Sequence, residues 1–155
     1  MKKNNIKIKN LNIKIHKTEK RIKVVIDTNV FISSFFNPSG TPRKIIDLWK
    51  TEKIILCISS PVLEEYIEVL LRLGFTEKTE LKELLELFQK QFNISASFKS
   101  ARIAAVKEDS KDDIIIECAV VNNADYIVSG DRHLLKLGIF RNIKIVPPSD
   151  FIKLF

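Results

Sequence analysis

Four carboxylic acids lie far apart along the chain, yet each stands where a predicted strand ends or near the start of a predicted helix. Asp27 directly follows the apolar run IKVVI, and Asp131 lies three residues after the run DYIV. Glu65 lies one turn into a predicted helix, and Asp112 begins another. Carboxylates brought together repel one another, and a hard divalent cation such as Mg²⁺ or Mn²⁺ removes that repulsion. One or two such cations can activate water for attack on a phosphodiester.

Each acid also has a structural interpretation when it is considered alone. Asp27, Asp112 and Asp131 all precede a predicted helix, where an aspartate side chain commonly accepts hydrogen bonds as the N-cap. Glu65 belongs to an acidic run, and such a run on a helix is usually a solvated face. Histidines and cysteines offer no alternative zinc site, because His16 and His133 stand apart and the cysteines lie in apolar segments.

Apolar runs that are typical of buried strands alternate with helical patterns along the chain. Strands are predicted at residues 22–26, 54–58, 93–98, 125–128 and 143–146. Helices are predicted at residues 30–36, 112–121 and 132–137, with four more that are capped by Thr41, opened by Ser60-Pro61 and closed near Gly74, capped by Thr76, and capped by Ser149. This alternation predicts an α/β fold of the Rossmann-like type, a three-layer α/β/α sandwich with a central parallel sheet.

The positive charge of the chain is concentrated near its N-terminus. The chain has 155 residues and a net charge of +7, but residues 1–23 contain nine basic residues and one acid, a net charge of +8. The other residues are close to neutral, at −1. We therefore divide the chain into a basic extension, residues 1–20, and one domain, residues 21–155. The extension is interpreted as an RNA-binding tail or as a solvated segment, either disordered or added to the sheet as a strand.

Two further features bear on where the protein works. Cys57 and Cys118 lie within apolar segments, as expected for reduced core residues of an intracellular protein. No run of eighteen apolar residues and no secretory signal pattern occurs, so a cytoplasmic protein without a membrane span is predicted.

Four segments of the chain resemble the PIN-domain family of ribonucleases in order and spacing. They read RIKVVIDTNVFISSFF, CISSPVLEEYIEVLLR, DSKDDIIIECAVVNNADYIVSGDRHLLKL and IKIVPPSDFIKL. The resemblance covers roughly residues 21–155 and is closest to the bacterial and archaeal branch that includes toxins of toxin–antitoxin pairs. It implies a PIN-like fold and a Mg²⁺- or Mn²⁺-dependent endoribonuclease whose products carry 5′-phosphate and 3′-hydroxyl ends.

The resemblance also assigns roles to particular residues. The four family acids match, in order, Asp27, Glu65, Asp112 and Asp131. Of these, Asp27, Asp112 and Asp131 are the expected metal ligands, and Glu65 binds metal or orients the water. Asn29 and Ser129 match polar positions that support the acids. The neighbours Glu64 and Asp113 remain alternatives to Glu65 and Asp112, because adjacent helix positions point about 100° apart and only one of each pair can face a shared site.

The partners follow from the same resemblance and from charge. An RNA substrate needs cations near the site, and Arg43, Lys44, Lys111 and Arg132 are the candidates, with ordinary surface charge as the alternative for each. A small antitoxin and a homodimer are expected, with exposed apolar residues of the predicted helix pair within Thr76–Gln91 as the candidate dimer interface.

Other functions fit the residues less well. A haloacid-dehalogenase-like phosphatase needs a second aspartate two residues after Asp27, where this chain has Asn29. A receiver-like phosphoacceptor domain needs a lysine after the last strand, where Pro147 stands. The main alternatives use the same fold: a non-catalytic RNA- or protein-binding module, or an RNA-processing nuclease without an antitoxin. All four acids are present, which favours catalysis.

Overall fold

The computed structural model describes residues 20–75, 79–97 and 110–155, with side chains from residue 113 onward in the last range. The predicted extension up to residue 19, the predicted cap Thr76 and the predicted strand residue Phe98 lie outside this description. The domain boundary near residue 20 therefore stays a prediction. Among the described helices, none is both long enough and apolar enough to cross a membrane.

The described strands form one mixed sheet in the order β3-β2-β1-β4-β6-β5. The strands are β1 (Ile22–Ile26), β2 (Ile54–Ser59), β3 (Ile94–Ser97), β4 (Tyr126–Val128), β5 (Ile139–Phe140) and β6 (Ile143–Val146). All neighbouring pairs are parallel except β5 with β6. The three apolar residues at the end of β1 are buried, as expected for a central strand that is covered on both faces.

Strand β5 is absent from the sequence-based prediction, which expects a wholly parallel sheet. It has only two residues, too few for a recognisable pattern, and it joins β6 through a two-residue turn at Arg141 and Asn142. Both turn residues have positive φ, 46° and 69°, as in the hairpin turns that match strand twist. The correction is therefore confined to one edge of an otherwise parallel sheet.

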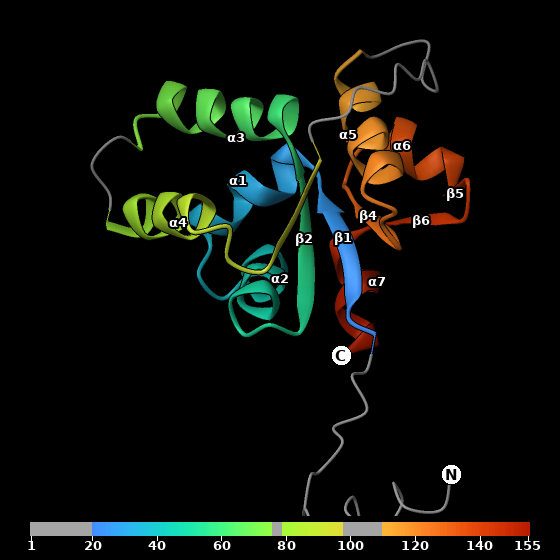
Figure 1. Cartoon of the computed structure of the whole chain (residues 1–155), viewed down its shortest axis with the longest axis horizontal. Helices are drawn as coiled ribbons and strands as arrows, with labels where there is room; N and C mark the ends of the chain where they lie inside the picture. The colour runs from blue at the N-terminus through green and yellow to red at the C-terminus, as the bar shows by residue number, and fades with distance from the viewer. Residues whose placement is uncertain (1–19, 76–78, 98–109) are drawn as a thin grey trace, which may run out of the picture.

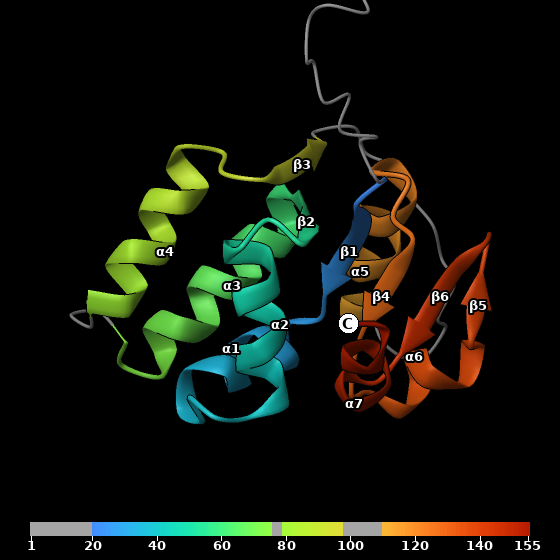
Figure 2. The same cartoon turned by 90° about the horizontal axis from the view of Figure 1, so that it is seen from below.

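Helices cover both faces of the sheet, which confirms the predicted three-layer α/β/α architecture. Helices α2 and α3 pack against β2, α5 packs against β1, β2 and β4, and α6 packs against β6 (Figures 1 and 2). The described helices are α1 (Thr28–Phe36), α2 (Thr41–Lys50), α3 (Ser60–Arg72), α4 (Thr79–Gln89), α5 (Ser110–Val121), α6 (Arg132–Leu137), α7 (Pro148–Phe151) and the 3₁₀ helix η1 (Ile152–Leu154).

Two predicted helix caps are wrong by one or two positions. Gly40 occupies the N-cap of α2, and Thr41 is already the first helical residue. Pro147 occupies the N-cap of α7, and Ser149 lies inside the helix. In each case a proline comes within the first two helical positions, because its fixed φ suits a helix start and its missing N–H is not needed there.

The core contains both cysteines and a cluster of aromatic rings. Burial raises the pKa of Cys57 to about 12 and that of Cys118 to about 11, so both stay protonated thiols, and neither forms a disulfide. The Phe31 ring stacks on the Tyr66 ring at 4.0 Å between centroids. The buried Tyr66 hydroxyl donates a hydrogen bond to the carbonyl of Ile26, the last residue of β1, and so ties α3 to the central strand.

Candidate active site

The order in which the chain adds strands to the sheet reverses between β1 and β4. The chain runs from β1 to β2 to β3 on one side, then crosses back and adds β4 on the other side of β1. In open α/β sheets, the carboxyl ends of the strands at such a switch point form the usual ligand crevice. Asp27 and Ser129 stand there, one residue past β1 and β4. The Asp27 N–H donates to the Val128 carbonyl at 2.9 Å, which holds the two strand ends together.

The Asp27 carboxylate is held by a serine on the neighbouring strand end. The Ser129 hydroxyl donates to Asp27 Oδ2 at 2.6 Å, and the same hydroxyl accepts the Asp131 N–H at 3.0 Å. Asp27 is only 8% exposed and Ser129 is fully buried. Asp27 occupies the N-cap position of α1, but its side chain makes no capping hydrogen bond. Asp27 is therefore the N-cap of α1 by its backbone position only, and its carboxylate does not cap the helix.

Glu65 reaches the same strand end from α3. The buried hydroxyl of Thr28, the residue after Asp27, donates to Glu65 Oε2 at 2.9 Å. Glu65 is partly buried, whereas Glu64 is exposed. The structure thus brings Glu65 toward the Asp27 segment and places Glu64 on the solvated face. Thr28 is a polar partner that the sequence reasoning missed, although the DTN tripeptide contains it.

Asp131 is the N-cap of α6, which is the structural role that the sequence also allowed for it. Its Oδ1 accepts the backbone N–H groups of His133 at 2.7 Å and Leu134 at 3.4 Å, and so caps α6. It is nevertheless partly exposed and acts electrostatically on Asp27. Capping and membership of the acidic site are therefore compatible for this residue.

Burial and two neighbouring acids make the charged form of Asp27 unfavourable. Burial is the largest cause that raises the Asp27 pKa, and the charges of Glu65 and Asp131 raise this pKa further. The hydrogen bonds from Ser129 and from the Thr28 backbone act in the opposite direction. A buried carboxylate beside two others is relieved either by a proton or by a cation, and these oxygen donors suit Mg²⁺ or Mn²⁺.

Among the described residues, no three His, Cys, Asp or Glu side chains form a group that could by itself hold a metal ion. The fourth predicted acid, Asp112, and the predicted RNA contact Lys111 lie in the first turn of α5, and their side chains are outside the description. Because α5 already begins at Ser110, Asp112 lies inside the helix and does not start it. Asp113 is partly buried. The choice between Asp112 and Asp113 therefore stays open.

The other predicted site residues occupy different surroundings. Asn29 in α1 is exposed, and its proposed support of the acids stays a prediction. Arg132 is exposed directly after Asp131, and Lys44 is exposed on α2. Their roles in RNA binding also stay predictions.

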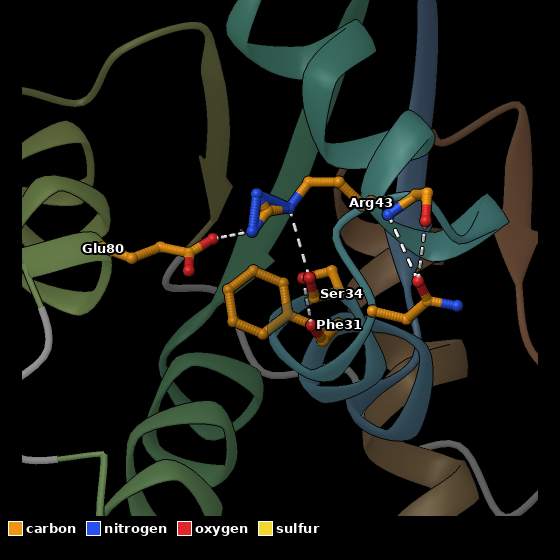
Figure 3. Close-up of polar contacts among 6 residues, drawn as sticks. Phe31, Ser34, Arg43 and Glu80 are labelled. Carbon is orange, nitrogen blue, oxygen red and sulfur yellow. Dashed lines mark hydrogen bonds and ion pairs between the residues drawn. The ribbon is translucent and has the colours of Figure 1, made fainter.

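Arg43 is engaged within the fold. Its guanidinium pairs with Glu80 of α4, and its Nε donates to the Ser34 carbonyl of α1 at 3.2 Å. Figure 3 shows the Arg43 side chain reaching between Ser34 and Glu80. The Arg43 side chain is only 16% exposed. The arrangement favours a structural role for Arg43, which links α1, α2 and α4, over the predicted contact with RNA.

We expect Arg43→Met to lower the free energy of unfolding by about 1 to 3 kcal/mol, because it leaves the Ser34 carbonyl and the Glu80 carboxylate without their partner. The value should fall toward the lower end, because the Glu80 side chain is 32% exposed and water compensates in part. Urea unfolding measures the change. Lys44→Met on the same helix is the matched control and should change little. Equal stability of the two variants would contradict the structural role.

Comparison with known proteins agrees with this fold. Residues 23–133 match the family described as PIN domain, which is more than half of the chain. The chain is also similar to the uncharacterized protein MJ1680 of Methanocaldococcus jannaschii, at 33% identity over an alignment that covers 91% of this chain and 97% of that protein. The chain therefore belongs to the PIN-domain family. PIN domains are generally nucleases, so the fold is nuclease-like.

Proposed function

We propose that the protein is a metal-dependent endoribonuclease that hydrolyses RNA phosphodiester bonds at the carboxyl ends of β1 and β4. The observation that carries the proposal is the buried Asp27 carboxylate, whose pKa is raised by burial and by the charges of Glu65 and Asp131. Such a site disfavours its own negative charge and has the oxygen donors that a hard cation prefers.

The described residues divide the work of the proposed site. Asp27 and Asp131, with Asp112, would hold Mg²⁺ or Mn²⁺, which when bound supplies positive charge for the phosphate and an activated water. Ser129 fixes the Asp27 carboxylate through its 2.6 Å hydrogen bond. Thr28 orients Glu65 by donating to Oε2, which leaves Glu65 at the site to bind metal or to accept a proton from the attacking water.

The proposal is tested by incubating the full chain with an end-labelled single-stranded RNA and Mn²⁺. We expect internal cleavage that stops when EDTA removes the metal and resumes when excess Mn²⁺ is restored. The products should carry 5′-phosphate ends, so a phosphate-dependent 5′ exonuclease should degrade the downstream fragments. Cleavage that continues unchanged in EDTA would contradict metal dependence, and binding without any cleavage would favour the non-catalytic module.

The pH dependence of cleavage should report on Asp27. Protons and cations compete for a carboxylate, so activity should fall as the pH drops through the raised pKa of Asp27. The Ser129 hydrogen bond lowers this pKa, so Ser129→Ala should raise the pKa further and move the acidic limb of the pH–rate profile to higher pH. Rates measured across pH at one fixed Mn²⁺ concentration below saturation, for the wild type and the variant, test this. A limb that stays in place, or moves to lower pH, would contradict the role of Ser129.

The biological context that we propose is the toxin of a toxin–antitoxin pair. Exposed apolar side chains offer surface for an antitoxin or a second copy of the chain: Phe36 is 62% exposed, Leu71 51% and Leu85, on α4, 39%. A toxin should arrest growth when it is expressed alone and should be neutralised by the product of a small adjacent reading frame. Absence of such a frame, with RNA cleavage retained, would instead favour an RNA-processing nuclease without an antitoxin.

A further inference from the structure

The strand registers place a row of side chains along the edge of the sheet that carries Asp27. Ser59, the last residue of β2, pairs directly with Ser97, the last residue of β3. The β1–β2 register, continued from Val24↔Leu56, sets Ser59 level with Asp27. Neighbouring strands lie about 4.8 Å apart, so Ser59 and Ser97 stand roughly 5 and 10 Å from Asp27 along this edge. A strand of RNA at Asp27 can therefore extend past both serines.

A pocket of about 100 Å³ opens beside this row. It lies between the beginning of α3 and the end of α4, over the ends of β2 and β3. Helix α3 leaves the carboxyl end of β2 in Figure 1, and this helix also carries Glu65. The lining of the pocket is mostly apolar, with a few polar side chains. The apolar lining comes from Ile58, Leu63, Phe88, Ile94 and Ala96.

The lining suits one flat, partly polar ring. Pockets that bind whole drug-sized ligands measure about 300 to 1,000 Å³, so this smaller pocket has room for a single ring system and not for a complete nucleotide. The Phe88 ring, which is half-buried, already belongs to an aromatic cluster with Trp49, at 5.5 Å between centroids. An inserted ring would extend that cluster. Ser60 and Gln91 also line the pocket, are exposed, and carry groups that can form hydrogen bonds with the edge of a ring.

We infer that this pocket binds one nucleobase of a single-stranded RNA whose backbone lies at Asp27, which rests on the proposed function. Unstacked bases of single-stranded RNA are bound in this way, by packing against aromatic side chains and by hydrogen bonds to their edges. The pocket would hold the substrate in position, and it would give the enzyme a preference for one base near the cleaved bond. The acids would perform the reaction and the pocket would select the site.

The inference is tested by measuring binding without cleavage. The full chain carrying Asp27→Asn is titrated, in the absence of divalent metal, into a fluorescent single-stranded RNA and into a ribose–phosphate oligomer of the same length without bases. Ala96→Leu, at an exposed position that lines the pocket, is added to fill it. We expect this variant to bind the RNA about tenfold more weakly and to bind the base-free oligomer as before.

A second variant removes a polar side chain of the lining without filling the pocket. Gln91 has a positive φ of 50°, so Gln91→Gly removes the side chain without straining the backbone. We expect a smaller loss of RNA affinity, about threefold to fivefold for one hydrogen-bonding group. Gln89→Ala, at an exposed position at the end of α4 outside the pocket, is the matched control and should bind as the parent does.

The outcomes of these measurements distinguish failure of the base pocket from failure of the catalytic proposal. Equal RNA affinity for Ala96→Leu, Gln91→Gly and the parent would overturn the base pocket, even if the wild type cleaves RNA. Equal losses toward RNA and toward the base-free oligomer would also overturn it, because they would indicate a backbone contact. A loss confined to RNA would support the pocket, even if the wild type fails to cleave and the catalytic proposal is abandoned.

Discussion

Asp27→Asn is expected to make the protein more stable and to abolish RNA cleavage at the same time. Asp27 is 8% exposed, and its carboxylate is repelled by the charges of Glu65 and Asp131. Asparagine has nearly the same shape, keeps an oxygen that can accept the Ser129 hydroxyl, and carries no charge. Replacements that relieve a strained functional site commonly add about 0.5 to 2 kcal/mol. Cleavage should fall by about a thousandfold or more, as for a lost electrostatic group.

The stability gain should depend on pH in a defined direction. Because the Asp27 pKa is raised in the folded state, the folded protein binds a proton more readily than the unfolded chain does. The wild type should therefore lose stability as the pH rises from the unfolded-state pKa toward the folded-state pKa. The gain from Asp27→Asn should be absent at low pH and complete above the folded-state pKa.

Thermal unfolding without metal, at acidic and neutral pH, measures this gain, which should appear as a rise in Tm of about 2 to 8 °C at neutral pH. Asp47→Asn, which replaces an exposed aspartate on α2, is the matched control and should change neither Tm nor cleavage. A lower Tm for Asp27→Asn at neutral pH would show that the carboxylate stabilises the metal-free fold, which is the opposite of what its surroundings predict.

Glu65→Gln should reduce cleavage by about a hundredfold, whereas Glu64→Gln should leave it within about twofold. The two glutamates are adjacent in α3, but Glu65 is partly buried and accepts the Thr28 hydroxyl, while Glu64 is exposed. Glutamine at position 65 keeps an oxygen that can accept this hydrogen bond, so the fold should be preserved and only the charge is lost.

Single-turnover cleavage rates of the two variants at equal Mn²⁺ provide the comparison, with circular dichroism to verify folding. If Glu64→Gln lost the activity and Glu65→Gln retained it, the second acid of the site would be Glu64, and the Thr28 contact would be structural only. Equal activity of both variants would remove α3 from the proposed site.

The parts of the fold that follow from local pattern were predictable from the sequence. The β-branched run of β1 and the apolar run of β2 are buried strands as predicted, and α6 has the predicted bounds. Strand β5 was not predictable, because two residues carry no periodicity and this strand depends on a turn with two positive φ angles. The caps of α2 and α7 lie one and two positions before the predicted ones, because a proline is tolerated at either of the first two helical positions and so does not fix the helix start.

In the candidate site, too, some features follow from local pattern and others depend on how distant elements pack. Asp27 and Ser129 each follow a strand end, and the pairing of β1 with β4 makes them neighbours. The sequence predicts the two strand ends but not the strand order, so Ser129 is expected near the acids only from the family resemblance. The Thr28 contact with Glu65 joins residues 37 positions apart and depends on how α3 packs on the sheet. Arg43 and Glu80 are likewise 37 positions apart, and their pairing depends on the packing of α2 against α4. A basic residue in the sequence cannot reveal whether its charge is used inside the fold.

Binding of Mn²⁺ to the full chain, measured by isothermal titration calorimetry at neutral pH, tests the central claim most directly. We expect the wild type to bind Mn²⁺, and to bind it more weakly as the pH is lowered, because the Asp27 pKa is raised and protons compete with the cation for this carboxylate. Asp27→Asn should bind about a hundredfold more weakly or not at all, and Asp47→Asn should bind as the wild type does. Equal Mn²⁺ affinity for Asp27→Asn and the wild type would contradict a metal-dependent site built on Asp27.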